Sequence, residues 1–296
     1  MAILGKGTAH GACSLLHAAG LQMGASLALD LPVTVRLRDN PSQNEVEDPD
    51  ELLPAVISAW QEFGHPLPKG DLHWMVRSKV PPRQGLKSSA AIAVAAIRAL
   101  ADATDIDLEI TQIIDMAVMA QRTSGVSITG SADDAWATAT EGWNLVDPNV
   151  PAAEGVLLEG PGPISEEWYV LILLREERKE RPDADSFAWH QHGFQQALNA
   201  LQVGNELVCL TCNGRAMAGV LNDHIGRRLT NDAFVNGGRA AGITGSGNAI
   251  VIFSPSVSEP IYTRIRGWYE SRAKDCELIE TKVLNPQPAE ESDDNE

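Results

Sequence analysis

The sequence predicts an α+β protein in which helices and strands are mixed without strict alternation. Residues 31–37 (LPVTVRL) alternate apolar and polar side chains, as a half-buried strand does, and residues 168–174 (WYVLILL) form an apolar run typical of a buried strand. Residues 53–63 instead repeat apolar side chains at helical spacing. A chain of 296 residues that is 44% hydrophobic is long enough for one large domain or two closely packed ones.

The same patterns predict the remaining elements. The other expected strands lie at residues 72–76 and 249–253, and the other expected helices lie at residues 88–103, 110–121, 184–201 and 205–223. A polar, acidic loop is expected over residues 40–51, and the Gly- and Pro-rich stretch 141–163 places the domain boundary. We therefore predict domains at 1–155 and 156–284, followed by a disordered acidic tail at 285–296.

The overall composition limits the partners that this protein can have. The chain has 23 basic and 40 acidic side chains, for a net charge of −17, which argues against nucleic-acid binding. Its first residues lack the pattern of a secretory signal. No apolar run reaches the roughly 18 residues that a membrane span needs. The sequence thus predicts a cytoplasmic protein without a nucleic-acid or membrane partner.

The stretch 80–91 (VPPRQGLKSSAA) has the composition of a phosphate-binding loop. Gly85 supplies backbone freedom, and a helix that begins at Ser88 presents free N–H groups and the positive end of its dipole. Lys87 adds a positive charge, and the hydroxyls of Ser88 and Ser89 can reach Mg²⁺ or a phosphate oxygen. Lys87 and Ser89 are expected at an exposed helix start. The alternative is an ordinary helix with a serine N-cap.

This stretch resembles the second motif of the GHMP kinases, which include galactokinase and the homoserine, mevalonate and phosphomevalonate kinases. The motif runs Gly-Leu-Gly-Ser-Ser, and here Lys87 takes the place of the second glycine. The form GLKSS is similar to that of the archaeal-type shikimate kinases of this superfamily. The resemblance implies a two-domain fold with the active site in the cleft between the domains.

Three further stretches are similar to the same family. Residues 9–31 resemble the opening of the archaeal shikimate kinases, with His17 where the family usually has Asn and Met23 where Lys or Arg is usual. Residues 127–135 (SITGSADDA) resemble the family's SVTGAFDDA, and residues 240–253 (AAGITGSGNAIVIF) resemble the third GHMP motif, a glycine turn before a strand. The four stretches occur in the family's order and spacing.

Asp133 and Asp134 by themselves allow two interpretations. Both can be acids in the first turn of a helix, where they stabilise the positive end of its dipole. Because adjacent helical residues face different directions, one can instead face a site while the other pairs with a base. The resemblance implies that Asp133 is the catalytic acid, which orients the attacking hydroxyl and accepts its proton.

The resemblance also implies ATP and Mg²⁺ as cofactors and shikimate as the substrate, phosphorylated at its 3-hydroxyl to shikimate 3-phosphate in aromatic amino-acid (chorismate) biosynthesis. The implied nucleotide-binding residues are Gly85, Leu86, Lys87, Ser88, Ser89, Ala90, Gly245, Ser246 and Gly247. Lys87 is also implied to be catalytic, by stabilising the transferred group or the substrate carboxylate. Ser88 and Ser89 are implied to reach Mg²⁺.

Two features of the site and three other functions stay open. Many GHMP kinases carry a Glu ligand of Mg²⁺ shortly before the catalytic acid, where this chain has Gln121 and Arg122. A substrate carboxylate needs a cation, and Arg83, Arg122 and Arg239 are the candidates. A homoserine or mevalonate kinase is the next alternative, against which Lys87 argues. A GHMP-fold decarboxylase and a non-catalytic ligand sensor are the others.

Overall fold

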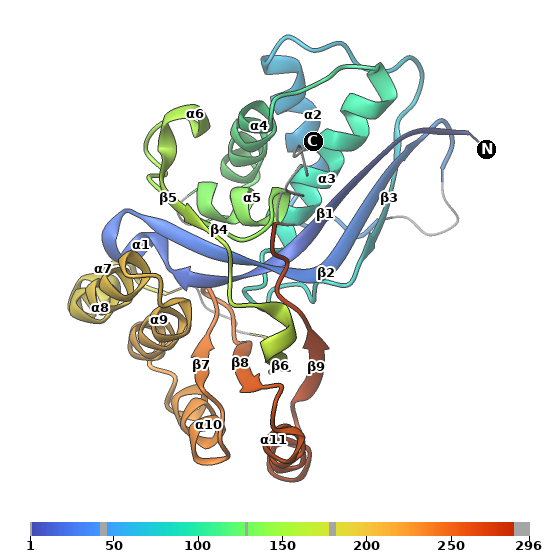
Figure 1. Cartoon of the computed structure of the whole chain (residues 1–296). Coiled ribbons are helices and arrows are strands. Elements are labelled where there is room, and N and C mark those ends of the chain that lie inside the picture. Colours follow the sequence, from blue (N-terminus) through green and yellow to red (C-terminus); the bar gives the residue numbers. More distant parts are fainter. Residues whose placement is uncertain (1, 42–45, 128–129, 178–181, 287–296) are drawn as a thin grey trace, which may run out of the picture.

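The computed structural model describes residues 2–41, 46–127, 130–177 and 182–286, which form two antiparallel β-sheets covered by helices (Figure 1). The first sheet has the order β1-β2-β4-β5, with β3 also paired to β2. Its strands are β1 (Ile3–Leu16), β2 (Gly24–Arg38), β3 (His73–Ser78), β4 (Trp143–Val146) and β5 (Val156–Gly160). The second sheet has the order β7-β8-β6-β9. Its strands are β6 (Trp168–Leu174), β7 (Ala240–Ile243), β8 (Ile250–Pro255) and β9 (Glu277–Thr281).

The helices fall into groups by the sheet that they contact (Figure 1). Helices α3 and α5 pack on β1 and β2, and α2 and α4 pack beside these two helices. Helices α8 and α9 contact strand β1 of the first sheet. Helices α9, α10 and α11 contact the second sheet. The helices are α1 (Ala18–Leu21), α2 (Leu52–Glu62), α3 (Ser88–Thr104), α4 (Ile110–Thr123), α5 (Ala132–Ala139), α6 (Ala152–Gly155), α7 (Ala184–Trp189), α8 (Gln191–Gln202), α9 (Glu206–Val220), α10 (His224–Val235) and α11 (Glu259–Arg272), with a 3₁₀ turn at Ser165–Glu167.

Helix α3 lies unusually close to strand β1 because the facing residues are small. A Cβ atom placed on Gly7 would lie 2.0 Å from the carbonyl oxygen of Ala95, and one on Gly5 would lie 2.2 Å from that of Ala99. Ala95, Ala99 and Ala103 of α3 therefore lie against the backbone of β1, where larger side chains would clash. This contact sets the direction of α3 across the first sheet.

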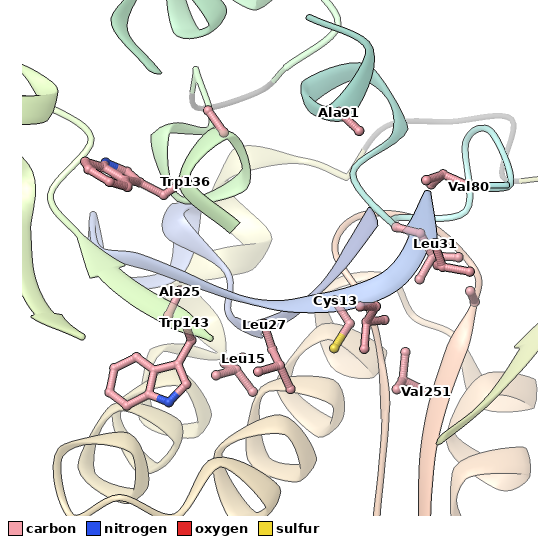
Figure 2. Packing of buried hydrophobic residues seen from close by; sticks show 14 of the residues in the cluster. Cys13, Leu15, Ala25, Leu27, Leu31, Val80, Ala91, Trp136, Trp143 and Val251 are labelled. Atoms are coloured by element: carbon pink, nitrogen blue, oxygen red, sulfur yellow. The ribbon is translucent and has the colours of Figure 1, made fainter. Parts of the chain in front are cut away.

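Strands β1 and β2 are buried on both faces where residues 11–16 pair with residues 24–29 (Figure 2). Figure 2 shows Cys13 and Leu15 on the face that looks toward Val251 of β8 in the second sheet, whereas Ala91 of α3 and Trp136 of α5 lie on the other side. All five side chains belong to one continuous apolar cluster. The core therefore extends without interruption through the helical layer, the first sheet and the second sheet.

The α+β class and most of the predicted elements are confirmed. The strand predicted at 168–174 is β6, and the helix predicted at 88–103 is α3. The helix predicted at 184–201 is divided at His190 into α7 and α8. Strand β1 was not predicted, because the buried positions of its first half are Gly and Ala rather than large apolar residues, and its second half, from Gly11 to Leu16, is buried on both faces and shows no alternation.

The Gly- and Pro-rich stretch 141–163 contains two strands of the first sheet, β4 and β5. Strand β5 follows residue 155, and the division of the chain at that residue stays a prediction.

Residues 287–296 of the predicted tail lie outside the described part of the chain. Asn285 accepts a hydrogen bond from the backbone N–H of Gly162 at 2.7 Å. None of the described helices combines the length and apolar composition needed to cross a membrane.

Candidate active site

The predicted phosphate loop ends in helix α3, as the sequence indicated. Gly85 and Lys87 both have left-handed backbone conformations, with φ values of 79° and 67°. Lys87 occupies the N-cap position without a capping side chain, so the alternative of a serine N-cap is wrong. The first N–H groups of a helix have no partner inside it, and α3 therefore offers donors for an anion. The hydroxyls of Ser88 and Ser89 make no hydrogen bond to the described part of the chain.

The glycine turn of the third motif lies directly on the phosphate loop. The Thr244 hydroxyl donates a hydrogen bond to the carbonyl oxygen of Gly85 at 3.0 Å, and the Ala249 N–H donates to that of Gln84 at 3.3 Å. A Cβ atom on Gly247 would lie only 2.2 Å from the carbonyl carbon of Gln84. The two motifs thus form one wall, and Gly247 is needed for their contact.

We expect Gly247→Ala to lower the free energy of unfolding by at least about 2 kcal/mol, because the new methyl group must push apart two backbone segments. Chemical denaturation of the variant measures this loss. Gly267→Ala in α11 is the matched control, since nothing lies within 4 Å of its added Cβ. Alanine favours a helix over glycine by about 1 kcal/mol, so the control should gain stability. Equal stability of the two variants would contradict this packing.

Five polar residues from three separate stretches meet beside this wall. Lys87 Nζ lies 2.6 Å from Asp134 Oδ1 and donates a hydrogen bond to Ser14 Oγ at 2.7 Å. The Ser26 hydroxyl lies 3.3 Å from Asp133 Oδ2 and 3.1 Å from Asp134 Oδ1, so it can donate to either carboxylate. Both acids lie in the first turn of α5, and Asp133 is buried.

The expectation that Lys87 sits at an exposed helix start is wrong. Its side chain is only 7% exposed, because it runs from the start of α3 toward α5 and β1, where it meets Asp134 and Ser14. Ser14 also accepts a hydrogen bond from the backbone N–H of Gly245 at 3.1 Å. Lys87 and Ser14 thereby connect all the motifs noted in the sequence.

Burial and this ion pair separate the pKa values of the two acids. Loss of water and, to a smaller extent, the negative charge of Asp134 raise the pKa of Asp133 to about 8. Burial would also raise the pKa of Asp134, but Lys87 outweighs it and lowers that pKa. The pKa of Lys87 is raised because the two carboxylates outweigh its burial. One acid is thus held charged while its neighbour can take a proton near neutral pH, a common arrangement in acid–base catalysis.

A cavity of about 520 Å³ opens where these elements meet. The predicted residues that line it are Gly85, Lys87, Ser88, Ser89, Asp133, Gly245, Ser246 and Gly247. Leu86 and Ala90 are buried in the core, so that only their backbone atoms can serve a ligand. Sequence reasoning did not assign Ser14, Ser26 or a partner for Asp134. No local pattern marks a small polar residue in a strand as part of a site.

The three candidate arginines lie in different places. Arg83 lines the cavity, with its guanidinium group 3.7 Å from Glu177 and 4.0 Å from Asp50. Arg122 donates a hydrogen bond to the carbonyl oxygen of Pro148, outside the cavity lining. Arg239 is exposed next to β7 and also lies outside that lining. Arg83 is therefore the candidate that the structure brings to the site.

The acidic loop before α2 also reaches the cavity, which was not predicted. Glu47, Asp48 and Asp50 belong to the cavity lining, and both oxygens of Asp48 accept hydrogen bonds from the first N–H groups of α2. Gln121 lines the cavity as well, with its side chain buried. No group of three or more His, Cys, Asp or Glu side chains placed to hold a metal ion occurs among the described residues.

Comparison with known proteins agrees with these motifs. Residues 52–142 match the family described as GHMP kinases N terminal domain. The shikimate kinase of Thermococcus kodakarensis is 29% identical over 146 residues, which cover 45% of this chain and 51% of that protein. The shikimate kinase of Halobacterium salinarum is 28% identical over 228 residues, which cover 74% of this chain and 78% of that protein. This chain thus spans about half the length of the Thermococcus relative.

Solved structures show the same architecture. The mevalonate kinase of Methanococcus jannaschii superimposes with a TM-score of 0.69 at 14% identity, covering 95% of this chain and 98% of that one. A putative homoserine kinase from Listeria monocytogenes has a TM-score of 0.66 at 18% identity, covering 95% and 96% of the two chains. The chain therefore has the two-domain GHMP kinase fold. The resemblance of this chain to the archaeal shikimate kinases is confirmed.

Proposed function

We propose that this chain is a small-molecule kinase that transfers the γ-phosphoryl group of ATP to an alcohol, and that the alcohol is shikimate. The observation that carries the proposal is the buried Lys87–Asp134 pair beside Asp133, in one cavity with the free N-terminus of α3. A phosphate-binding helix start and a poised acid are the two parts that phosphoryl transfer to a hydroxyl requires. Similarity to shikimate kinases supports the choice of acceptor.

The residues present fit a nucleotide. Gly245 and Gly247 form a wall without side chains opposite the N-terminus of α3, and the donors there suit a phosphate chain. Ser88 and Ser89 would contact the phosphate chain or its Mg²⁺, which often keeps several water ligands and needs few from the protein. When bound, ATP supplies the phosphoryl group and Mg²⁺ neutralises its charge.

The chain's own acids would act on the acceptor hydroxyl. Asp133 would orient this hydroxyl and accept its proton, for which its raised pKa is suited. Lys87 would hold Asp134 in its charged form and, through Ser14, keep α3 and the glycine turn in place. This role differs from a direct contact of Lys87 with the transferred group, because its ammonium group is already paired.

We expect the purified protein, with Mg²⁺ and ATP, to phosphorylate shikimate at its 3-hydroxyl with kcat/KM at least about 10³-fold above that for homoserine and mevalonate. A site that hydrogen-bonds several substrate groups rejects molecules that lack them by such factors. Arg83 also lines the cavity, and because its side chain is 59% exposed and lies at the long distances of 3.7 Å and 4.0 Å from Glu177 and Asp50, it is more available than Lys87 to meet the carboxylate of shikimate. Coupled detection of ADP release with a panel of alcohols measures the preference.

The same assay separates the alternatives. Ready turnover of homoserine or mevalonate without turnover of shikimate would retain the kinase class and remove the substrate assignment. Absence of ADP release with every alcohol would contradict an enzymatic role and favour a ligand sensor.

A further inference from the structure

His17 has a fixed orientation at the edge of the cavity. It follows strand β1 as the N-cap of α1, and its Nδ1 atom accepts a hydrogen bond from the backbone N–H of Ala19 at 3.2 Å. The backbone N–H of His17 donates a hydrogen bond to Asn213 Oδ1 at 2.9 Å. The centroid of the His17 ring lies 5.0 Å from that of Phe187. The backbone and the ring are thus both held by neighbouring elements.

These contacts determine the proton position on the imidazole. Because Nδ1 accepts a hydrogen bond, the single proton of the neutral ring must be on Nε2. Burial and, to a smaller extent, the nearby charge of Lys87 lower the pKa of His17 to about 4, although the charge of Asp134 opposes the shift. The ring is therefore uncharged at neutral pH and presents one N–H donor.

The Nε2–H group is free to serve a ligand. It has no hydrogen-bond partner in the described part of the chain. Because Nε2 is not enclosed by other atoms, a ligand can reach it. His17 lines the cavity together with Ser14, Lys87 and Asp134. In contrast, Lys87 and Ser14 already hydrogen-bond each other, so their groups are engaged.

We propose that His17 is a specificity-determining residue whose Nε2–H donates a hydrogen bond to a hydroxyl oxygen of the acceptor alcohol. This inference rests on the proposed kinase function. A neutral donor suits the oxygen of a hydroxyl, whereas a carboxylate is better matched by a cation. It also disfavours an ammonium group, whose N–H donors would face another donor beside the charged Lys87. His17 thereby contributes to selecting a polyol over an amino alcohol.

Two substitutions separate this role from the capping of α1. Serine in H17S can still cap the helix but is too short to reach the cavity, whereas glutamine in H17Q can reach the cavity with an amide N–H but caps poorly. With shikimate, we expect H17S to lower kcat/KM by about 10- to 100-fold, mainly through KM, with little change in melting temperature. H17Q should retain at least about 5-fold more kcat/KM than H17S, at a lower melting temperature.

Shikimate analogues identify the hydroxyl that is contacted. The 3-hydroxyl is the proposed phosphoryl acceptor, so 4-deoxy- and 5-deoxyshikimate are the probes. One of them should lose about 10-fold or more in kcat/KM with the unaltered protein and much less with H17S. Equal losses in both proteins, or H17S more active than H17Q, would overturn this inference.

The outcome stays separate from that of the proposed function. If the unaltered protein prefers another alcohol, H17S and H17Q are compared on that alcohol, with the same expected order. Turnover of shikimate that H17S leaves unchanged overturns the role of His17 alone. No turnover of any alcohol overturns both.

Discussion

Asp133→Asn is expected to lower kcat by at least about 10²-fold, the usual contribution of one acid–base group, while ATP binding survives. It should also stabilise the folded protein. Asp133 is buried next to a second acid, and its carboxylate is therefore costly to keep in the native state. We expect a gain in the free energy of unfolding of roughly 2 kcal/mol at neutral pH or above. Steady-state kinetics, calorimetric titration with ATP and chemical denaturation measure the three effects.

The pH dependence follows from the direction of the shift. Folding raises the pKa of Asp133 from 3.8 to about 8, so the native state binds this proton more tightly than the unfolded chain does. Stability contributed by Asp133 is therefore lost as pH rises through that range. The free energy of unfolding that Asp133→Asn gains over the unaltered protein is thus largest above about pH 8. Since a base must be unprotonated, kcat/KM should rise with pH, reach half of its maximum near pH 8 and level off above it.

Asp134→Asn is the matched control for this assignment. It removes the charge that raises the pKa of Asp133 and leaves Lys87 free to pair with Asp133. The rise of kcat/KM with pH should therefore shift to lower pH. If Asp134→Asn abolishes turnover and Asp133→Asn does not, the catalytic role belongs to Asp134.

Lys87→Ala is expected to cost about 3 kcal/mol of stability, because it leaves the largely buried carboxylate of Asp134 without its charged partner. Turnover should fall with it, since Lys87 also holds Ser14 and through it the glycine turn. This result differs from the small loss expected for an exposed helix start. Thermal and chemical denaturation, with ADP release in parallel, measure the two losses.

A second substitution tests the cause of this loss. Removal of both charges in Lys87→Ala/Asp134→Ala should recover a large part of the stability, because no uncompensated charge remains. Ser89→Ala is the control at the same helix start: its hydroxyl has no partner in the described part of the chain, so stability should change little while catalysis weakens. A loss below about 1 kcal/mol for Lys87→Ala would show that the ion pair is not structural.

Local patterns in the sequence were sufficient for elements with a clear apolar signal. Helix α2 was predicted from apolar residues at helical spacing, and strand β6 from a continuous apolar run. The four motifs, through their resemblance to the GHMP kinases, also indicated the fold and placed Gly85, Ser88, Asp133 and Gly247 in one predicted site, whose cavity they all line. These inferences needed no knowledge of distant contacts.

The roles of the charged residues depended on contacts that only the folded chain makes. Lys87 could have met a phosphate, a carboxylate or solvent. Lys87 contacts Asp134 and Ser14 because the start of α3 lies next to α5 and β1. Small residues on α3 and β1 allow these two elements to approach closely. The separate pKa values of Asp133 and Asp134 follow from burial and from the partner of each acid, neither of which adjacent positions in a sequence reveal. The sequence by itself thus determined which chemistry was available, and tertiary packing decided which acid is held charged and which one can accept a proton.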